Sequence, residues 1–436
     1  MSTTPRPAVV DDPALSSAVG WYADSTPLPA ASAPLRGDIS ADVCILGGGY
    51  TGLSAALELA TRGFKGVVLE AERTGWGASG RNGGQALVGY GCDLSVLERE
   101  LGTADAHKAF ALSVEGLELL RRRIAAHGID CDWQSGHASV AVRRRQLPAL
   151  QEEAARMQRL GVPVQWWDQS ALRAQVASPR YHGGLFDPLS GHLHPLAFAL
   201  GLARAAREAG VVIHEHSAVT LLQREPQPVM RTAQGSVRAR HAVIAGNAWL
   251  RGIAPELEAR IMPVGTYVGA TPPLGAARAN ALIRNGMAVA DVNWALDYFR
   301  LSADHRLLFG GRASYSARPP LRLRASMTQR MHTVFPQLRD VSLDDAWGGF
   351  IDITRNRAPH WGRLTPDIWF AQGFSGHGVA AAGLAGLLIA EAIAGQSGRI
   401  EVFERIQHRP FPGGRLLRMP LLVAAMSWYK LRDALW

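Results

Sequence analysis

The sequence has no long apolar run and few cysteines. None of its apolar stretches reaches the roughly 20 residues that a membrane-spanning helix needs. The first 37 residues lack a basic start followed by an apolar core, so we expect no signal peptide. The three cysteines, Cys44, Cys92 and Cys131, are odd in number and form no C-x-x-C pair. These absences exclude a disulfide framework and a zinc site of the usual spacing, and they predict a cytoplasmic protein.

Lysine is also scarce. Of the 46 basic residues only Lys65, Lys108 and Lys430 are lysines, so arginine carries most of the net charge of +9. A basic chain can bind nucleic acid or an anionic membrane surface. Here the arginines are scattered, and the two tight runs, 121–123 and 143–145, contain no aromatic residue that could stack on bases. We therefore expect solvated basic faces and no nucleic-acid partner.

The amino-acid composition is that of an ordinary globular protein. Hydrophobic residues make up 47% of the chain and charged residues 19%, which is enough apolar material for a large core. A length of 436 residues predicts two or three domains. No internal repeat is visible.

A dinucleotide-binding motif opens the ordered part of the chain. The apolar run 43–46 predicts a buried strand, and residues 47–52 fit G-x-G-x-x-G. Residues 53–60 have helical apolar spacing, and 67–69 predict a second strand that ends on Glu70. Glu70 follows the last glycine by 18 residues, close to the distance of about 20 expected for the acid that binds a ribose hydroxyl.

The residue types within this motif each have a physical role. Gly47 allows the tight turn, Gly49 lets the backbone approach a pyrophosphate, and Gly52 lets helix and strand pack closely. Tyr50 and Thr51 open the helix, whose free N–H groups and dipole favour a phosphate. This stretch alone does not decide between NAD and FAD.

A second glycine-rich loop follows Glu70 over residues 71–85. An NAD domain has no need of such a loop, whereas an extended FAD must pass its ribityl chain and ring over more backbone. Arginine and asparagine among the glycines argue against a flexible linker, because both can donate hydrogen bonds. The candidate cofactor residues of this loop are Ala71, Ser79, Arg81, Asn82, Gly83 and Gly84.

A third glycine block lies near the end of the chain. The short strand 369–371 leads into residues 373–378, and a small-residue helix follows over 379–394. Its N-terminal dipole would favour the pyrimidine end of a flavin, which becomes anionic on reduction. The candidate cofactor residues of this block are Gly373, Ser375, Gly376, His377, Gly378 and Val379. Two more, Val219 and Gly246, lie where a three-strand meander begins and ends.

The remaining segments predict a separate substrate-covering region. Residues 95–128 have the spacing of an amphipathic helix, 138–142 of a strand and 146–160 of another helix. Residues 259–350 are rich in aromatic and strand-forming residues, and their clearest hairpin spans 298–309. We expect an antiparallel sheet that forms the other wall of a pocket.

Taken together, the three glycine blocks resemble the D-amino-acid oxidase superfamily of FAD enzymes, on its glycine/sarcosine-oxidase-like branch. The resemblance extends over nearly the whole chain past residue 37, to amine oxidases that act on glutamylated polyamines. The Pro-Phe-Pro-Gly-Gly-Arg run near the C-terminus is its most distinctive piece, because the superfamily at large lacks it. The further stretches that carry this resemblance are 191–196, 336–338, 372–378 and 410–415.

The resemblance implies an α/β fold with a Rossmann-like FAD-binding domain and an α+β substrate domain built on an antiparallel sheet. The FAD-binding domain would comprise 38–94, 190–258 and 352–408. The substrate domain would comprise 95–189 and 259–351. Apart from the resemblance, residues 1–37 are rich in proline, alanine and serine, which predicts a poorly ordered arm that Trp21 and Tyr22 pin to the body. Residues 409–436 would be a tail that packs on its own domain more readily than on a membrane surface.

The activity implied is FAD-dependent oxidation of the terminal amine of gamma-glutamylputrescine, or of a similar glutamylated amine. The products would be an aldehyde, ammonia and hydrogen peroxide, a step of polyamine catabolism. The alternative is an oxidase or dehydrogenase of another amine or imino acid, such as sarcosine, glycine or pipecolate.

Two departures from the superfamily bear on the cofactor and on oxygen. No cysteine follows Cys131, and Asn82 stands where some relatives tether the flavin through histidine, so we expect non-covalent FAD. Relatives use a lysine to assist the reaction with oxygen, but no lysine lies between Lys108 and Lys430. Either His377 or an arginine such as Arg300 or Arg312 supplies that charge, or another acceptor takes the electrons.

The four candidate catalytic residues are His377, Arg300, Tyr298 and His194, and Tyr298 also belongs to a candidate aromatic wall. The amine must be neutral to release a hydride, and an aromatic wall disfavours its charged form. Arg300 could pair a glutamyl carboxylate through two hydrogen bonds. His194, before a predicted helix, and His377, in the third glycine block, could face the flavin or the substrate. The candidates for the aromatic wall are Trp294, Tyr298, Phe299 and Trp347.

Overall fold

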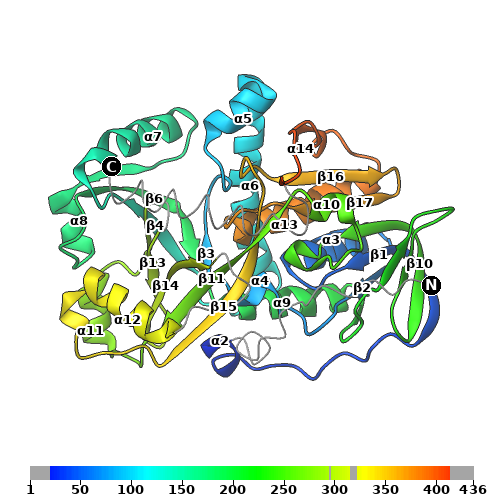
Figure 1. Ribbon diagram of the computed structural model, residues 1–436, viewed down its shortest axis with the longest axis horizontal. Coiled ribbons are helices and arrows are strands. Elements are labelled where there is room, and N and C mark those ends of the chain that lie inside the picture. Colours follow the sequence, from blue (N-terminus) through cyan, green and yellow to red (C-terminus); the bar gives the residue numbers. More distant parts are fainter. Residues whose placement is uncertain (1–19, 294–295, 315–321, 413–436) are drawn as a thin grey trace.

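The computed structural model describes residues 20–293, 296–314 and 322–412. Two β-sheets organise these residues. Sheet A has eight strands and sheet B has nine. They lie side by side in Figure 1, sheet A in the right half and sheet B in the left half.

Sheet A is the parallel sheet that the dinucleotide motif predicts. Its order is β16-β17-β10-β1-β2-β7, and every pair from β17 to β7 is parallel. Parallel sheets need cover on both faces, and helices α3 (Tyr50–Thr61), α9 (Pro195–Glu208) and α13 (Gly378–Ile393) pack around this one. The strands are β1 (Gly37–Leu46), β2 (Gly66–Leu69), β7 (Val212–His214), β8 (Leu221–Gln223), β9 (Val229–Arg231), β10 (Gly235–Ile244), β16 (His360–Thr365) and β17 (Ile368–Gln372).

The predicted strand–helix–strand unit is confirmed, with one extension. Strand β1 begins at Gly37 and pairs with β10 along its whole length, starting at Gly235. The small residues of α13 let it pack closely on helix α3, while Gly378 and Ala382 at its start line the cavity described below. A Cβ at Gly386 would lie 2.6 Å from the backbone nitrogen of Ala55, so only glycine allows this approach.

Sheet B is the predicted antiparallel sheet, apart from one parallel pair, β12 with β4. Its order is β15-β11-β14-β13-β12-β4-β6-β3, with β5 added on β6. The strands are β3 (Gln85–Ala86), β4 (Gln134–Val140), β5 (Gln165–Asp168), β6 (Gly183–His192), β11 (Met262–Ala270), β12 (Ala288–Asp291), β13 (Tyr298–Leu301), β14 (Leu307–Ser314) and β15 (Asp345–Ile353).

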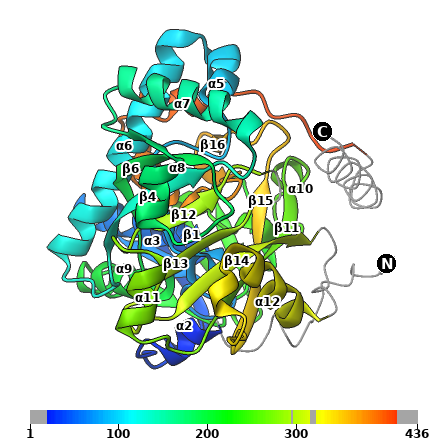
Figure 2. The same ribbon diagram turned by 90° about the vertical axis from the view of Figure 1, so that its left-hand side faces the viewer.

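Helices cover one face of sheet B, and its other face is turned toward the cofactor loops. Figure 2 shows α8 (Gln169–Gln175), α11 (Ala276–Leu282) and α12 (Leu323–Val334) in front of the sheet. Phe299, Phe309 and other apolar side chains of the sheet pack beneath them in one buried cluster. The opposite face meets the glycine-rich loop of residues 78–84, as the contacts below establish.

Of the remaining helices, the sequence analysis predicted those over 95–128 and 146–160, and both are present. The helix predicted over 95–128 is two helices, because Gly102 between them has φ of +78°, a left-handed conformation. The other helices are α2 (Trp21–Asp24), α4 (Ala78–Arg81), α5 (Leu94–Leu101), α6 (Thr103–Ala126), α7 (Leu147–Arg159), α10 (Pro255–Glu258) and α14 (Glu401–Glu404).

The N-terminal segment of residues 20–36 is anchored near its two ends, and most of its side chains between these anchors are exposed. Tyr22 of α2 is fully buried, which confirms its predicted anchoring role, and Leu35 is 2% exposed. The segment then joins β1 at Gly37. The predicted C-terminal tail lies almost entirely outside the described residues. Within the described ranges, no helix is both long and apolar enough to cross a membrane.

Candidate active site

A cavity lies where the parallel strands of sheet A end, and all three glycine blocks line it. This is the edge at which open parallel sheets bind their ligands. Ile351 and Asp352, at the end of β15, close it from sheet B. The predicted cofactor residues that line this cavity are Gly47, Gly49, Tyr50, Thr51, Glu70, Ala71, Ser79, Asn82, Val219, Gly246, Gly376, Gly378 and Val379.

The turn between β1 and α3 has the geometry that a pyrophosphate needs. Gly47 has φ of +106°, and a Cβ there would lie 2.6 Å from the Ala245 carbonyl oxygen. A Cβ at Gly52 would lie 2.0 Å from the Gly47 oxygen, so Gly52 serves packing and does not line the cavity. The N-cap residue Gly49 has no side chain to cap α3, and Ser79 Oγ accepts the Tyr50 N–H at 3.0 Å. The next N–H groups of the first turn are left for an anion.

Glu70 stands at the end of β2 with its carboxylate already oriented. Its Oε2 accepts a hydrogen bond from the Gly48 N–H at 2.6 Å, and its Oε1 accepts one from the Glu72 N–H at 3.0 Å. Burial raises the pKa of this carboxyl above its usual value. Each oxygen keeps a lone pair, so the carboxylate can still accept from ribose hydroxyls.

The loop after α4 is held by its carbonyl groups. The carbonyl oxygens of four successive residues, Arg81 to Gly84, each accept a hydrogen bond from a different part of the chain. The donors are, in order, Trp347 Nε1 (3.0 Å), Tyr22 Oη (2.9 Å), Arg300 Nε (2.7 Å) and the Leu193 backbone N–H (2.9 Å). The loop is therefore fixed from sheet B and from the N-terminal segment at once.

Arg81 lies behind the cavity instead of lining it. Its guanidinium is stacked 4.7 Å from the Trp76 ring, and its Nε donates to the Trp76 carbonyl at 2.6 Å. Its Nη2 is buried without a hydrogen-bond partner, and burial lowers the pKa of Arg81 to about 10. A cofactor contact by Arg81 stays a prediction, for which Nη2 is the available atom.

The loop before α13 is organised by a residue that the sequence analysis missed. Asp352 is fully buried at the cavity wall, and its carboxylate accepts hydrogen bonds from the N–H groups of Gly373 and Phe374. Burial raises the pKa of Asp352 to about 7. Gly373 and Ser375 have positive φ, so both shape the turn and do not line the cavity. Nothing in the local sequence marks Asp352, because its partners lie 21 and 22 residues later.

Two of the four predicted catalytic residues have no free polar group. Arg300 is 2% exposed, and its guanidinium donates to Gly83, to Leu301 and to the Tyr22 hydroxyl. His194 is 4% exposed, and its Nδ1 accepts the Ala197 N–H as the cap of α9. Burial, aided by the charge of Arg300, lowers the pKa of His194 to about 4. In this geometry Arg300 and His194 hold neighbouring parts of the chain in place. Their contact with substrate stays a prediction.

The other two predicted catalytic residues keep free polar groups. Tyr298 is partly exposed, its ring lies against Gly83, and its hydroxyl has no hydrogen-bond partner in the described part of the chain. His377 occupies the N-cap position of α13 without a side-chain cap hydrogen bond, and its Nδ1 is buried without a partner. Burial, with the charge of Arg357, lowers the pKa of His377 to about 4 and so favours the neutral ring near pH 7. A role of His377 in the reaction with oxygen stays a prediction.

The aromatic wall is only partly as expected. Phe299 lies on the helix-covered face of sheet B, with its ring 4.9 Å from that of Phe335, so its predicted place in the pocket wall is wrong. Trp347 is on the cofactor-side face and holds the loop of residues 81–84, which we call the flavin loop. Trp294 lies outside the described residues. Three aromatic residues of the cavity that the prediction did not name are Phe374, Trp76 and Trp249, and the rings of the two tryptophans are 5.4 Å apart.

Two buried histidines also escaped the sequence analysis. His137 of β4 and His192 of β6 are 5% and 4% exposed, and each has one ring nitrogen without a partner. Burial lowers the pKa of both to about 3, and the nearby His377 contributes at His137. A strand histidine has no sequence signal that separates a polar pocket from a packed core.

These observations fit an extended FAD. The helix N-terminus of α3, the carboxylate of Glu70 and the glycine-lined path to α13 match a pyrophosphate, a ribose and a flavin ring in that order. None of the three cysteines lines the cavity.

Comparison with known proteins agrees with this geometry. The family model of FAD-dependent oxidoreductases matches residues 42–392. The chain is 44% identical to gamma-glutamylputrescine oxidoreductase of Escherichia coli, over 95% of this chain and 98% of that protein. It is 41% identical to a probable oxidoreductase, OrdL, of Haemophilus influenzae, over 95% and 96% of the two chains.

Among solved structures, glycine oxidase of Geobacillus kaustophilus has the same fold. It superposes with a TM-score of 0.72 at 20% identity, covering 85% of this chain and 99% of the oxidase. The expectations of an FAD-binding fold with mixed α/β sheets, and of an oxidoreductase, are confirmed. The chain belongs to the family of FAD-dependent oxidoreductases of the D-amino-acid oxidase type.

Proposed function

We propose that this FAD-dependent enzyme oxidises the terminal primary amine of gamma-glutamylputrescine, or of a similar glutamylated amine. The single observation that carries the proposal is the identity with the E. coli enzyme, which extends over nearly the full length of both chains. The division into a discontinuous FAD-binding domain and a substrate domain, with the bounds given above, is part of the same proposal.

The reaction removes a hydride from the carbon beside the amine. When bound, the flavin supplies the two-electron acceptor. The amine becomes an imine, which water converts to an aldehyde and ammonia, and the two electrons pass to oxygen to give hydrogen peroxide, or to another carrier.

The chain's own residues orient the amine and keep it neutral. We assign the contact with the amine to the two candidates with free polar groups, Tyr298 and His377. A neutral imidazole accepts a hydrogen bond from an uncharged amine and does not repel it. The surroundings of both residues disfavour the ammonium form, because burial in an apolar wall penalises charge.

The test is anaerobic bleaching of the flavin by four amines side by side: gamma-glutamylputrescine, putrescine, sarcosine and pipecolate. We expect the glutamylated amine to bleach the flavin at the lowest concentration. Faster bleaching by sarcosine or pipecolate would move the enzyme to the alternative class of amine or imino-acid oxidases.

Two further properties belong to the same proposal. FAD is held without a covalent bond, so acid precipitation should release all yellow colour into the supernatant. The acceptor is oxygen or another carrier, and stopped-flow reoxidation of the reduced enzyme in air distinguishes them. A small-molecule amine is the proposed partner and the cytoplasm the proposed location.

A further inference from the structure

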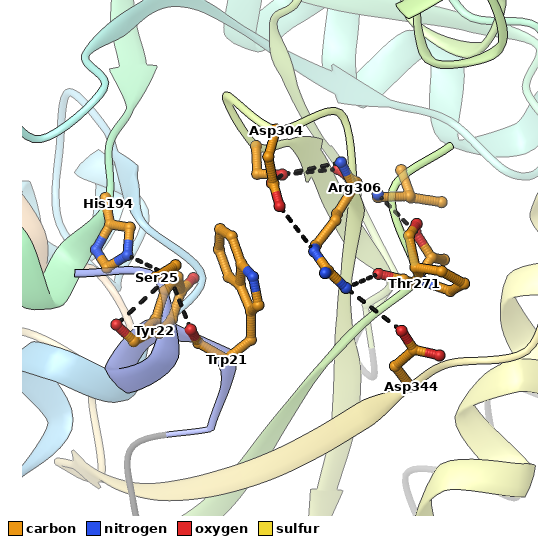
Figure 3. Close-up of polar contacts among 11 residues, drawn as sticks. Trp21, Tyr22, Ser25, His194, Thr271, Asp304, Arg306 and Asp344 are labelled. Carbon is orange, nitrogen blue, oxygen red and sulfur yellow. Dashed lines mark hydrogen bonds and ion pairs between the residues drawn. The ribbon is translucent and has the colours of Figure 1, made fainter. Parts of the chain in front are cut away.

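The N-terminal segment forms a brace on the flavin loop, and Figure 3 shows how it is seated. His194 Nδ1 accepts a hydrogen bond from Ala197, so the proton of the neutral ring lies on Nε2, which donates to the Ser25 hydroxyl at 3.0 Å. That hydroxyl donates in turn to the Trp21 carbonyl at 2.7 Å. The Arg306 guanidinium lies 5.8 Å from the Trp21 ring. Helix α2 is thus fixed to α9 and to sheet B.

Tyr22 extends from this anchored helix to the flavin loop. Its ring centroid lies 5.0 Å from that of Trp347 and 4.8 Å from that of His194. Its hydroxyl donates to the Asn82 carbonyl at 2.9 Å and accepts from Arg300 Nη2 at 3.1 Å. All groups of this contact are buried or partly buried, so water is a poor substitute for the hydroxyl.

The Asn82 carbonyl and the Gly83 N–H belong to one peptide unit. This peptide is trans, so the two groups point in opposite directions. Asn82 lines the cofactor cavity, whereas Gly83 and Tyr22 do not, so this peptide lies at the edge of the cavity with Tyr22 on its protein side. The Gly83 N–H therefore points away from Tyr22, and it donates to no acceptor in the described structure.

We propose that Tyr22 is a positioning residue that turns the Gly83 N–H toward the cofactor cavity, where it acts on the flavin. A fixed N–H donor stabilises the electron-rich reduced ring, whereas a carbonyl turned the same way would destabilise it. Glycine at position 83 would let the peptide flip, and the Tyr22 hydroxyl prevents this. The residue lies outside the family-matched region, which begins at residue 42. The inference rests on FAD binding and not on the identity of the amine.

Tyr22→Phe removes only the hydroxyl and keeps the ring contacts, so the fold should persist. We expect the flavin absorption maxima of the holoenzyme to shift and its midpoint potential to fall. A tenfold loss of preference for the reduced form corresponds to about 30 mV. The potential is measured with a dye and a chemical reductant, so the result does not depend on the proposed substrate.

A control variant separates positioning from general weakening. Tyr181→Phe removes a buried hydroxyl that has no hydrogen-bond partner and does not belong to the contacts of α2. It should keep the wild-type potential and spectrum. A wild-type potential and spectrum in Tyr22→Phe, even with a lowered Tm, would overturn the proposal.

Discussion

Sheet A and sheet B hold the ligand-facing groups of this enzyme in different ways. Sheet A offers strand ends and turns, such as Gly47 after β1, Glu70 after β2 and Gly246 after β10. Sheet B offers side chains from within its strands, such as Arg300 of β13 and Trp347 of β15, which hold a loop of the other region. The first kind of site depends on backbone shape and the second on contacts between distant residues.

This difference decides where a substitution should act. Changes at the ends of sheet A strands should cost cofactor affinity, while changes on sheet B should leave the cofactor bound and alter the rate. The following four experiments test that separation, from the largest expected effect to the smallest.

Gly52→Ala should abolish stable FAD binding. The new Cβ would lie 2.0 Å from the Gly47 carbonyl oxygen, so the turn that receives the pyrophosphate must shift. Overpacking of this kind costs about 1–3 kcal/mol of unfolding free energy. The measurement is the ratio of flavin to protein absorbance after purification. Gly398→Ala is the matched control, because nothing lies within 4 Å of its Cβ. Equal flavin content in the two variants would contradict the packing argument.

Arg300→Gln should lower kcat by about tenfold or more, because a charged hydrogen bond to the buried Gly83 carbonyl is worth about 1.5–3 kcal/mol. If Arg300 only holds the loop in place, kcat should fall by the same factor with gamma-glutamylputrescine and with putrescine. If Arg300 instead binds the glutamyl carboxylate, KM should rise for the glutamylated amine alone. Steady-state kinetics with both amines decides between the two roles.

Glu70→Gln should weaken FAD binding by about tenfold with little change in the rate of the loaded enzyme. The amide can accept the Gly48 hydrogen bond but offers one oxygen where the carboxylate offers two, and one bond to a charged group is worth about 1.5 kcal/mol or more. Fluorescence titration of the apoprotein measures the Kd. Glu256→Gln, whose carboxylate pairs with Arg224, serves as the control and should bind FAD like the wild type.

Asp352→Asn should change the pH dependence of stability by a few degrees in Tm. The pKa of Asp352 is about 7 in the fold against 3.8 unperturbed. Its contribution is therefore complete below about pH 4 and is lost as pH rises to about 7. Asparagine does not ionise, so the variant should be least stable relative to wild type near pH 4. The difference in Tm between wild type and variant should then become smaller as the pH rises to 7. A Tm difference that stays constant across this range would mean that the carboxyl titrates normally.

The sequence located much of the cofactor cavity, although seven of the twenty predicted cofactor residues do not line it. The order strand, glycine turn, helix and acid is local, so the places of Gly47, Gly49 and Glu70 follow from spacing along the chain. The loop residues Ser79 and Asn82 were also predicted, because glycines around them require a close ligand.

The holding contacts could not be predicted, because they join residues far apart in the chain. Arg300 and Gly83 are 217 residues apart, and Trp347 and Arg81 are 266 apart. Arginine is a residue type that commonly binds carboxylates, and only the three hydrogen-bond partners of Arg300 in the fold indicate another role. Tyr22 lies in a segment whose proline and alanine content predicts disorder, and its burial follows from the pocket that His194 and Trp347 provide.

The interleaving of the two sheets along the chain has a consequence for biosynthesis. Strand β17 of sheet A ends at Gln372 and strand β15 of sheet B at Ile353, while the first strand of each comes from the first 90 residues. Neither sheet can be completed on the ribosome before most of the polypeptide has emerged. Maturation should then proceed in one step after synthesis, and heating should melt both halves together in a single transition.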